Sequence, residues 1–179
     1  MENTGINDNI GVKYGLITGL IVVIITLLQY LGGIDMFMSP VGYISYLVII
    51  TVAVLAALKV RKGNEGFLEF RQALKITFTV FALSLLLQTI FIYILFNFVD
   101  PSFKDVVSVE TMNKAEQWMR KAGRSDAEID KWLDMERGKD PYAIGRVIMG
   151  YATFCIVSFI FCLLISLIVR KSKPAFKNI

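Results

Sequence analysis

Four long stretches of the chain contain no charged residue, and each holds about 20 residues or more. They cover residues 15–34, 36–58, 76–99 and 147–169. Because an α-helix rises about 1.5 Å per residue, a run of this length can cross a hydrocarbon core roughly 30 Å thick. The pattern therefore predicts four transmembrane helices, over about residues 12–33, 41–60, 76–99 and 143–169, in a single membrane domain that covers residues 1–179.

A soluble bundle of unusually apolar helices is the alternative interpretation. A helix that is apolar on every face needs lipid or complete burial, and four such helices cannot all bury one another in a chain of 179 residues. The composition agrees with a membrane protein, because 55% of the residues are hydrophobic and the mean hydropathy is +0.60. We therefore expect an all-α, polytopic membrane protein.

The polar segment between the third and fourth spans carries the start signals of two further helices. Asp100 and Pro101 follow the third apolar run; aspartate is a good N-cap residue, and proline suits the first helical position. Ser125 and Glu128 have the spacing of a capping box, which begins a second helix. We therefore predict a helical hairpin outside the membrane, over about residues 101–140.

The distribution of basic residues indicates which connections face the cytoplasm, because short basic connections stay on that side. The segment 100–140 carries eight basic and ten acidic residues, but it is long, and long connections carry little weight in this rule. The second connection and the C-terminal tail are short and basic, and they contain Lys59, Arg61, Lys62, Arg71, Lys75, Arg170, Lys171, Lys173 and Lys177. We expect both termini to be cytoplasmic and the hairpin to be extracytoplasmic.

Small residues recur along one face of the first span and one face of the fourth. Gly11, Gly15 and Gly19 are four residues apart and predict a close contact with another helix, most simply one of the same chain. The alternative is that glycine is simply common in membrane helices. A stripe on the fourth span could accept such a glycine face; it consists of Ala152, Cys155, Ser158, Cys162 and Ser166.

A few polar side chains lie within the spans or near their ends. Gln88 is near the middle of the third span, where an amide needs a hydrogen-bond partner because hydrocarbon supplies none. Together with Gln29, Asn97 and Arg146 it could line a polar groove for a substrate. Hydrogen bonding between helices is the simpler interpretation, because no Asp, Glu, Lys or Arg lies deep in a span.

Both tryptophans of the chain, Trp118 and Trp132, fall in the predicted hairpin. Their rings could form a docking surface for a protein partner, or they could lie at the membrane interface or hold the two helices together. The hairpin has more acidic than basic residues, so we expect it to bind neither anionic lipid nor nucleic acid through a basic patch.

The residue types that usually carry catalysis are scarce. The chain has no histidine, which removes the commonest general base and the commonest metal ligand. The two cysteines both lie inside the fourth apolar run and form no cluster with histidine, so a zinc site is not expected. We therefore expect no metal, no cofactor and no enzymatic activity.

The string FNFVDPSF, residues 96–103, is accompanied by further short motifs. The residues that carry the likeness are Met119, Gly123, Ser125, Glu128 and Ile129, the string ISLI at 165–168, Tyr14 with Gly15, and Phe70 with Gln72, Ala73 and Leu74. Together they resemble the bacterial membrane protein family called "domain of unknown function 4199", over about residues 14–173. The resemblance implies a location in the bacterial inner membrane, and it implies no activity and no catalytic residues.

Two functions remain open. The first is a non-enzymatic subunit or interaction partner of a larger inner-membrane assembly, which would contact membrane lipid and either a protein partner or a second copy of the chain. The second is a small carrier or flippase-like protein for a lipid-linked or amphiphilic substrate, which would use a groove at Gln29, Gln88, Asn97 and Arg146. A polar cleft that reaches Gln88 would favour the carrier.

Overall fold

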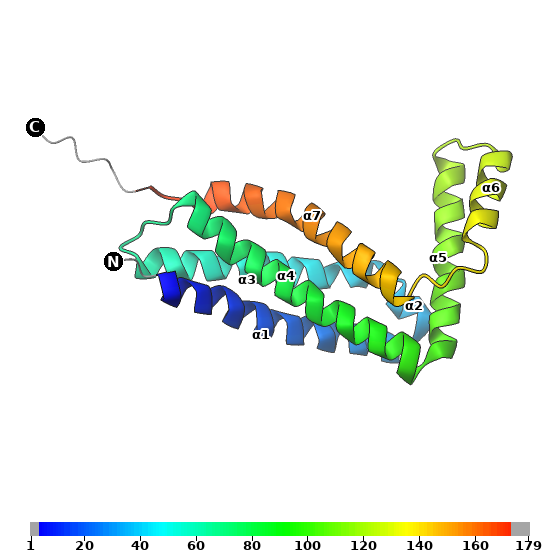
Figure 1. Ribbon diagram of the computed structural model, residues 1–179, viewed down its shortest axis with the longest axis horizontal. Helices are drawn as coiled ribbons and strands as arrows, with labels where there is room; N and C mark the ends of the chain where they lie inside the picture. The colour runs from blue at the N-terminus through cyan, green and yellow to red at the C-terminus, as the bar shows by residue number, and fades with distance from the viewer. Residues whose placement is uncertain (1–3, 173–179) are drawn as a thin grey trace, which may run out of the picture.

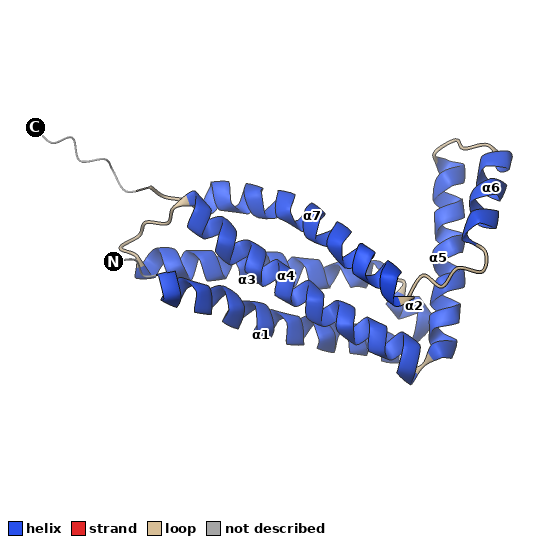
Figure 2. Cartoon of the chain, in the orientation of Figure 1, coloured by secondary structure: helices blue, strands red, loops and turns tan. Residues whose placement is uncertain are grey.

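The computed structural model describes residues 4–172, with side chains from Ile10 onward, and this part of the chain is helical apart from short connections (Figure 2). The basic tail residues Lys173 and Lys177 lie outside the described residues. The four long helices are α1 (Thr4–Leu31), α3 (Tyr43–Gly63), α4 (Phe70–Ile94) and α7 (Ile144–Val169). They form a bundle, and α5 (Pro101–Lys121) and α6 (Asp126–Glu136) lie at one end of it (Figure 1). The all-α prediction is confirmed.

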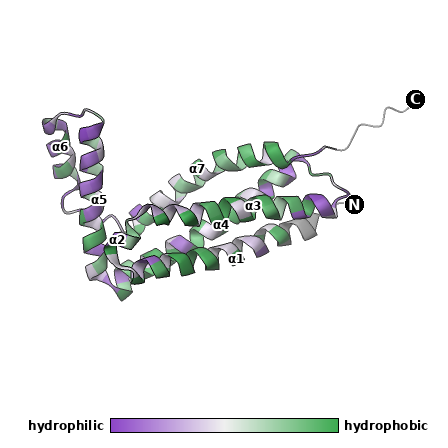
Figure 3. Cartoon of the chain, turned by 180° about the vertical axis from the view of Figure 1, so that it is seen from behind, coloured by the Kyte–Doolittle hydropathy of each residue, from purple (hydrophilic) through white to green (hydrophobic). Residues whose placement is uncertain are grey.

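The four long helices have the length and composition of membrane spans. Their apolar segments are Ile10–Leu31, Pro40–Gly63, Phe70–Val99 and Ile144–Val169, and at most 33% of the residues in each are buried. Most of the apolar side chains therefore point outward, which suits lipid and not water. Apolar residues follow the bundle, whereas polar residues gather on α5 and α6 (Figure 3). The chain is thus a multi-pass membrane protein.

The third span begins at Phe70, earlier than the start of the charge-free run. The first turns of α4 carry Arg71 and Lys75 at exposed positions, while Ala73 is fully buried. A helix with one buried face and one basic face continues without a break into the span. Residues 70–75 therefore form the first turns of α4.

α4 lies at the centre of the bundle, packed against α1, α3 and α7. The glycine face of α1 contacts it: a Cβ atom at Gly15 would lie 3.0 Å from the Cβ of Leu83, and one at Gly19 would lie 3.1 Å from the Cβ of Leu87. Gly11 lies against Thr79 in the same way. The glycine face therefore packs on α4 and not on the small-residue stripe of α7.

The stripe on α7 faces α4 from the other side. Ser158 and Cys162 are buried, and Ser166 shares a hydrogen bond of 3.3 Å with Thr77 of α4. Cys155 is half-buried. Ala152 is exposed, so this residue of the stripe does not contribute to packing within the chain.

Two short helices that the periodicity did not predict connect the spans at the α5 end. α2 (Gly33–Phe37) follows α1, and a 3₁₀ turn, η1 (Pro40–Gly42), leads into α3. Ser39 caps this turn, because its hydroxyl oxygen accepts a hydrogen bond from the Val41 N–H at 3.3 Å. The chain from α1 to α3 is thereby folded against the end of the bundle.

The opposite end of the bundle is closed by the connection between α3 and α4. Leu68 and Lys171 exchange two backbone hydrogen bonds of 2.8 Å each, as an isolated antiparallel bridge. Arg61 donates to the carbonyl oxygens of Gly66 at 3.1 Å and Val169 at 3.4 Å. These contacts fix the end of α7 to the short basic connection.

Candidate functional site

Five aromatic rings meet where the spans end and the hairpin begins. We call this cluster the aromatic junction; it consists of Tyr30 of α1, Phe37 of α2, Phe96, Phe103 of α5 and Tyr142. The centroids of Phe96 and Tyr142 are 4.5 Å apart, and those of Tyr30 and Phe103 are 5.0 Å apart, both edge to face. Such pairs contribute about 0.5–1.5 kcal/mol each beyond their burial. The junction therefore fixes the start of α5 on the bundle.

Asp100 determines where the third span ends. A π-helical segment, η2 (Leu95–Val99), follows α4, and the Asp100 N–H donates to the Leu95 carbonyl oxygen at 2.7 Å. One carboxylate oxygen of Asp100 then accepts from the Phe103 N–H at 2.9 Å, and the other accepts from the Tyr30 hydroxyl at 3.0 Å. The same side chain caps α5 and attaches it to α1. The predicted cap is confirmed, and its contact with Tyr30 was not predicted.

Further polar contacts attach the hairpin to the bundle. The Asn97 amide donates to the carbonyl oxygen of Tyr142 at 3.2 Å, which joins η2 to the segment before α7. The Lys114 ammonium donates to the Met38 carbonyl oxygen at 2.6 Å. The sequence suggested Asn97 as part of a groove. In the structure its side-chain amide links η2 to the segment before α7.

The base of the hairpin carries paired charges. Lys104 and Asp140 form an ion pair of 2.9 Å, and Glu136 accepts from both Lys139 and Arg146 at 3.0 Å. The hydrogen bond from Arg146, followed by that from Lys139, lowers the pKa of Glu136, and Lys104 lowers the pKa of Asp140. Both carboxylates are therefore ionised near pH 7, where a carboxylate of lowered pKa is a poor proton acceptor.

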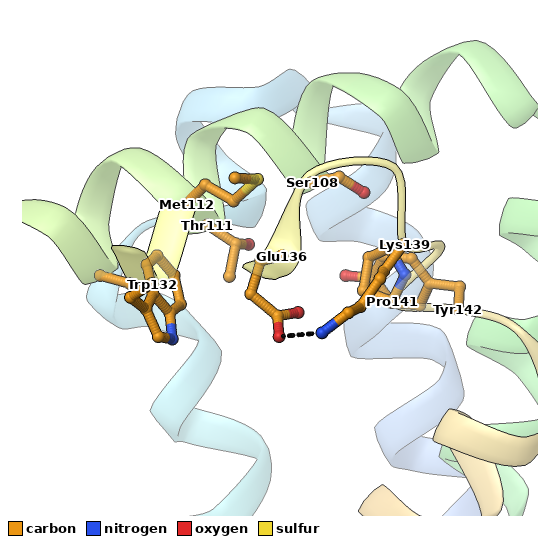
Figure 4. A pocket seen from close by; sticks show the side chains of 9 residues that line it. Ser108, Thr111, Met112, Trp132, Glu136, Lys139, Pro141 and Tyr142 are labelled. Carbon is orange, nitrogen blue, oxygen red and sulfur yellow. Dashed lines mark hydrogen bonds and ion pairs between the residues drawn. The ribbon is translucent and has the colours of Figure 1, made fainter. Parts of the chain in front are cut away.

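A cavity of about 170 Å³ lies between α5, α6 and the segment that leads to α7. Figure 4 shows Trp132 at one end and Pro141 with Tyr142 at the other, with the Glu136–Lys139 pair between them. Its lining residues are Ser108, Thr111, Met112, Ala115, Trp132, Glu136, Lys139, Pro141 and Tyr142.

The wall that α5 contributes to this cavity is effectively apolar. The hydroxyl groups of Ser108 and Thr111 donate to backbone carbonyl oxygens one turn earlier, at 2.8 Å and 2.7 Å. Apolar cavities of about 150 Å³ can hold a benzene ring. The hairpin therefore has room for one apolar or aromatic group beside a pair of charges.

The two tryptophans do not share one surface role. Trp132 of α6 is half-buried in the wall of the cavity, which α5 also lines. Trp118 is 76% exposed on α5 and does not line the cavity. Of the predicted pair, Trp118 alone offers most of its ring to a neighbouring molecule.

The four residues suggested for a carrier groove differ in their contacts. The Gln88 amide donates to the Thr26 hydroxyl at 3.2 Å, between α4 and α1. Gln29 is 5% exposed, and its amide nitrogen has no hydrogen-bond partner among the described residues. Asn97 bonds to Tyr142, and Arg146 pairs with Glu136 of the hairpin. Gln88, Asn97 and Arg146 are therefore each hydrogen-bonded to another residue of the chain.

Sequence reasoning missed Phe37 and Tyr142 of the aromatic junction. Tyr142 follows Pro141 directly and Phe37 is three residues before Pro40, so an aromatic residue close to a proline near the end of a span could have indicated them. Sequence gave no signal that Tyr30 would reach Asp100, seventy positions away. Among the described residues, no group of three His, Cys, Asp or Glu side chains is placed to hold a metal ion.

Comparison with known proteins bears on the chain as a whole. No curated protein and no solved structure matched it. A model of the family described as "Protein of unknown function (DUF4199)" matches residues 13–171, which include all four apolar helices and the hairpin. The resemblance noted in the sequence is confirmed, and the chain belongs to this DUF4199 family.

Proposed function

We propose that this chain is a non-enzymatic integral protein of the bacterial inner membrane, which acts as a subunit or interaction partner of a larger membrane assembly. The observation that carries the proposal is the α5–α6 hairpin, which is held on the span ends by the aromatic junction and which opens a cavity of about 170 Å³ between its helices. A fixed platform with room for one apolar group suits the docking of another protein.

The charge of α6 supports a basic partner segment. Between Asp126 and Glu136 the helix has five acidic residues and one lysine. Complementary charge guides association and selects partners, and an acidic helix beside an apolar cavity suits a segment with basic residues around one apolar anchor. A protein partner or a second copy of this chain could supply such a segment.

The positions of the basic residues support an extracytoplasmic hairpin. Arg61, Lys62 and Lys171 are at the end of the bundle opposite α5 and α6 (Figure 1), and short basic connections stay in the cytoplasm. The partner surface would then face away from the cytoplasm. A carrier function is less favoured, because Gln88, Asn97 and Arg146 already bond to other residues of the chain.

Purification of the tagged protein in mild detergent, followed by mass spectrometry, tests the proposal. We expect a stoichiometric partner with the wild-type protein and loss of that partner from the variant Asp130→Lys, which reverses an exposed charge on α6. Asp105→Lys is the matched control, because Asp105 is an exposed aspartate on α5.

The control should retain the partner. The proposal is contradicted if the wild-type protein is recovered alone as a monomer, or if Asp130→Lys retains the same proteins as the wild type. Recovery of a second copy of the chain, lost in Asp130→Lys, would support the homo-oligomeric form of the proposal.

A further inference from the structure

One face of α5 is directed at the end of the bundle along its whole length. Phe103, Val107, Lys114 and Trp118 are four, seven and four residues apart, so they lie on the same side of the helix. Phe103 is in the aromatic junction, Val107 is buried against Leu95 and Phe96, and Lys114 bonds to Met38 at 2.6 Å. This face therefore looks from the hairpin toward the membrane.

Trp118 lies on this face one turn beyond Lys114. α5 crosses the end of the bundle and continues past it on the side of α7 (Figure 1). Trp118 consequently has no span beneath it and is 76% exposed. The neighbouring surface of α7 is also apolar and exposed, with Ile148 at 61% and Met149 at 72%, as expected of a surface that meets lipid. If lipid surrounds α7, the ring of Trp118 faces the lipid headgroups around that helix.

The charges of the two hairpin helices also favour a position of α5 closer to the membrane than α6. α5 carries four basic and three acidic residues, whereas α6 carries one basic and five acidic residues. Lys114 and Lys121 are on either side of Trp118 at four and three residues. Phospholipid headgroups attract basic residues and repel acidic ones, and tryptophan is enriched at the membrane interface. Charge therefore places α5 nearer the bilayer than α6.

We propose that α5 lies along the phospholipid headgroups beside α7, with Trp118 inserted as an interfacial anchor and α6 on the side that faces water. The exposed ring of Trp118 thus contacts the bilayer and not another protein. This inference goes beyond the docking proposal and does not depend on it, because it requires only that the four spans cross a membrane.

Tryptophan fluorescence in vesicles of phosphatidylethanolamine and phosphatidylglycerol tests this inference. The contribution of Trp118 is the difference in emission between the wild type and Trp118→Phe. A nitroxide on the lipid headgroup should quench this difference at least about twofold more strongly than it quenches the remaining Trp132 emission. A nitroxide deep in the acyl chain should quench it less. Labelled lipid in both leaflets makes the result independent of the direction of insertion.

Aqueous iodide provides the second measurement. Iodide should quench the Trp118 contribution weakly, because a ring among headgroups is shielded from water. Strong quenching by iodide without quenching by nitroxide would place the ring in water and overturn the inference. Quenching by neither would mean that protein covers Trp118, which overturns it as well. The unchanged helical signal of Trp118→Phe in circular dichroism verifies that this exposed residue does not determine folding.

Discussion

Gly15 sets the distance between α1 and α4. A Cβ atom there would lie 3.0 Å from the Cβ of Leu83 and 3.2 Å from the Thr79 carbonyl oxygen, and a backbone oxygen cannot move aside. We predict that Gly15→Leu lowers the melting temperature in detergent, at a cost of roughly 1–3 kcal/mol from overpacking. Gly150→Leu is the control, because nothing lies within 4 Å of a Cβ at Gly150. Equal melting temperatures for the two variants would contradict the close contact.

Ser45 and Ser84 are both buried serines, but they differ in hydrogen bonding. The Ser84 hydroxyl donates to the Gly15 carbonyl oxygen at 3.2 Å, whereas the Ser45 hydroxyl has no partner among the described residues. An unpaired buried hydroxyl costs free energy. We predict that Ser45→Ala leaves the melting temperature unchanged or raises it, and that Ser84→Ala lowers it, since a hydrogen bond between membrane helices is worth about 0.6 kcal/mol.

The outcome of this comparison also tests how the Ser45 hydroxyl is satisfied. It is 1% exposed and lies on α3, three residues after Gly42. The Gln29 amide nitrogen, which is unpaired too, would lie 3.8 Å from a Cβ atom at Gly42. If Ser45→Ala destabilises the protein as much as Ser84→Ala, the hydroxyl has a partner such as a buried water, and the prediction is wrong.

At the scale of single elements, local signals predicted the helix starts well. The capping box is present: the Ser125 N–H donates to the Glu128 carboxylate at 3.1 Å, and the Glu128 N–H donates to the Ser125 hydroxyl oxygen at 3.4 Å. Asp100 caps α5 as expected, and Ser39 caps η1 through the same kind of local bond. Each of these bonds joins residues two or three positions apart, so the sequence pattern contains the whole interaction.

Elements that depend on distant residues could not be predicted in this way. The π-helical η2 lies where Phe96 packs against Phe37 and Tyr142, from two other parts of the chain. The bridge between Leu68 and Lys171 joins segments about a hundred residues apart. Hydrophobic periodicity reports which face of a helix is buried, but it does not name the partner of that face. The cavity and the aromatic junction were missed for this reason.

The base of the hairpin should respond to acid. Arg146 and Lys139 lower the pKa of Glu136 below its ordinary value of 4.5, so the ionised form is favoured in the folded protein. This stabilisation is present above pH 4.5 and is lost as the pH falls through the lower folded value. We predict that proteolysis of the hairpin, measured with an acid-active protease, accelerates below about pH 4.5.

Glu136→Gln isolates the contribution of this carboxylate. The variant should already be cleaved faster than the wild type near pH 6, and its cleavage should depend less on pH in the acid range. Asp140 and Glu128, whose pKa values are lowered by Lys104 and by the Ser125 backbone, titrate in the same direction, so part of the acid response should remain. An identical pH profile for wild type and variant would contradict the role of Glu136.

At the scale of the whole molecule, the sequence predicted four spans and a hairpin but not their arrangement. Charge-free runs identify segments that favour lipid, and all four became long helices. Which helix lies at the centre depends on side-chain shape. α4 takes this place because it meets the glycine face of α1 on one side and the serines and Cys162 of α7 on another. For Gln88 the preferred interpretation was a hydrogen bond between helices, and its amide bonds to Thr26 of α1; polarity alone could not name that partner.

The orientation of the four spans in the membrane determines on which side of the membrane the α5–α6 hairpin lies. In a background with Cys155→Ala and Cys162→Ala, which removes both native thiols, Ser125→Cys should react with an impermeant maleimide in intact spheroplasts. Asn64→Cys, at the end of α3 on the opposite side of the bundle, should react only after the cells are opened, because the basic connection beside it stays in the cytoplasm. Reaction of both cysteines after opening verifies that each is accessible. The reverse pattern would place the hairpin and its partner surface in the cytoplasm. It would also show that the charges of segment 100–140 influence the orientation more than those of the short basic connections.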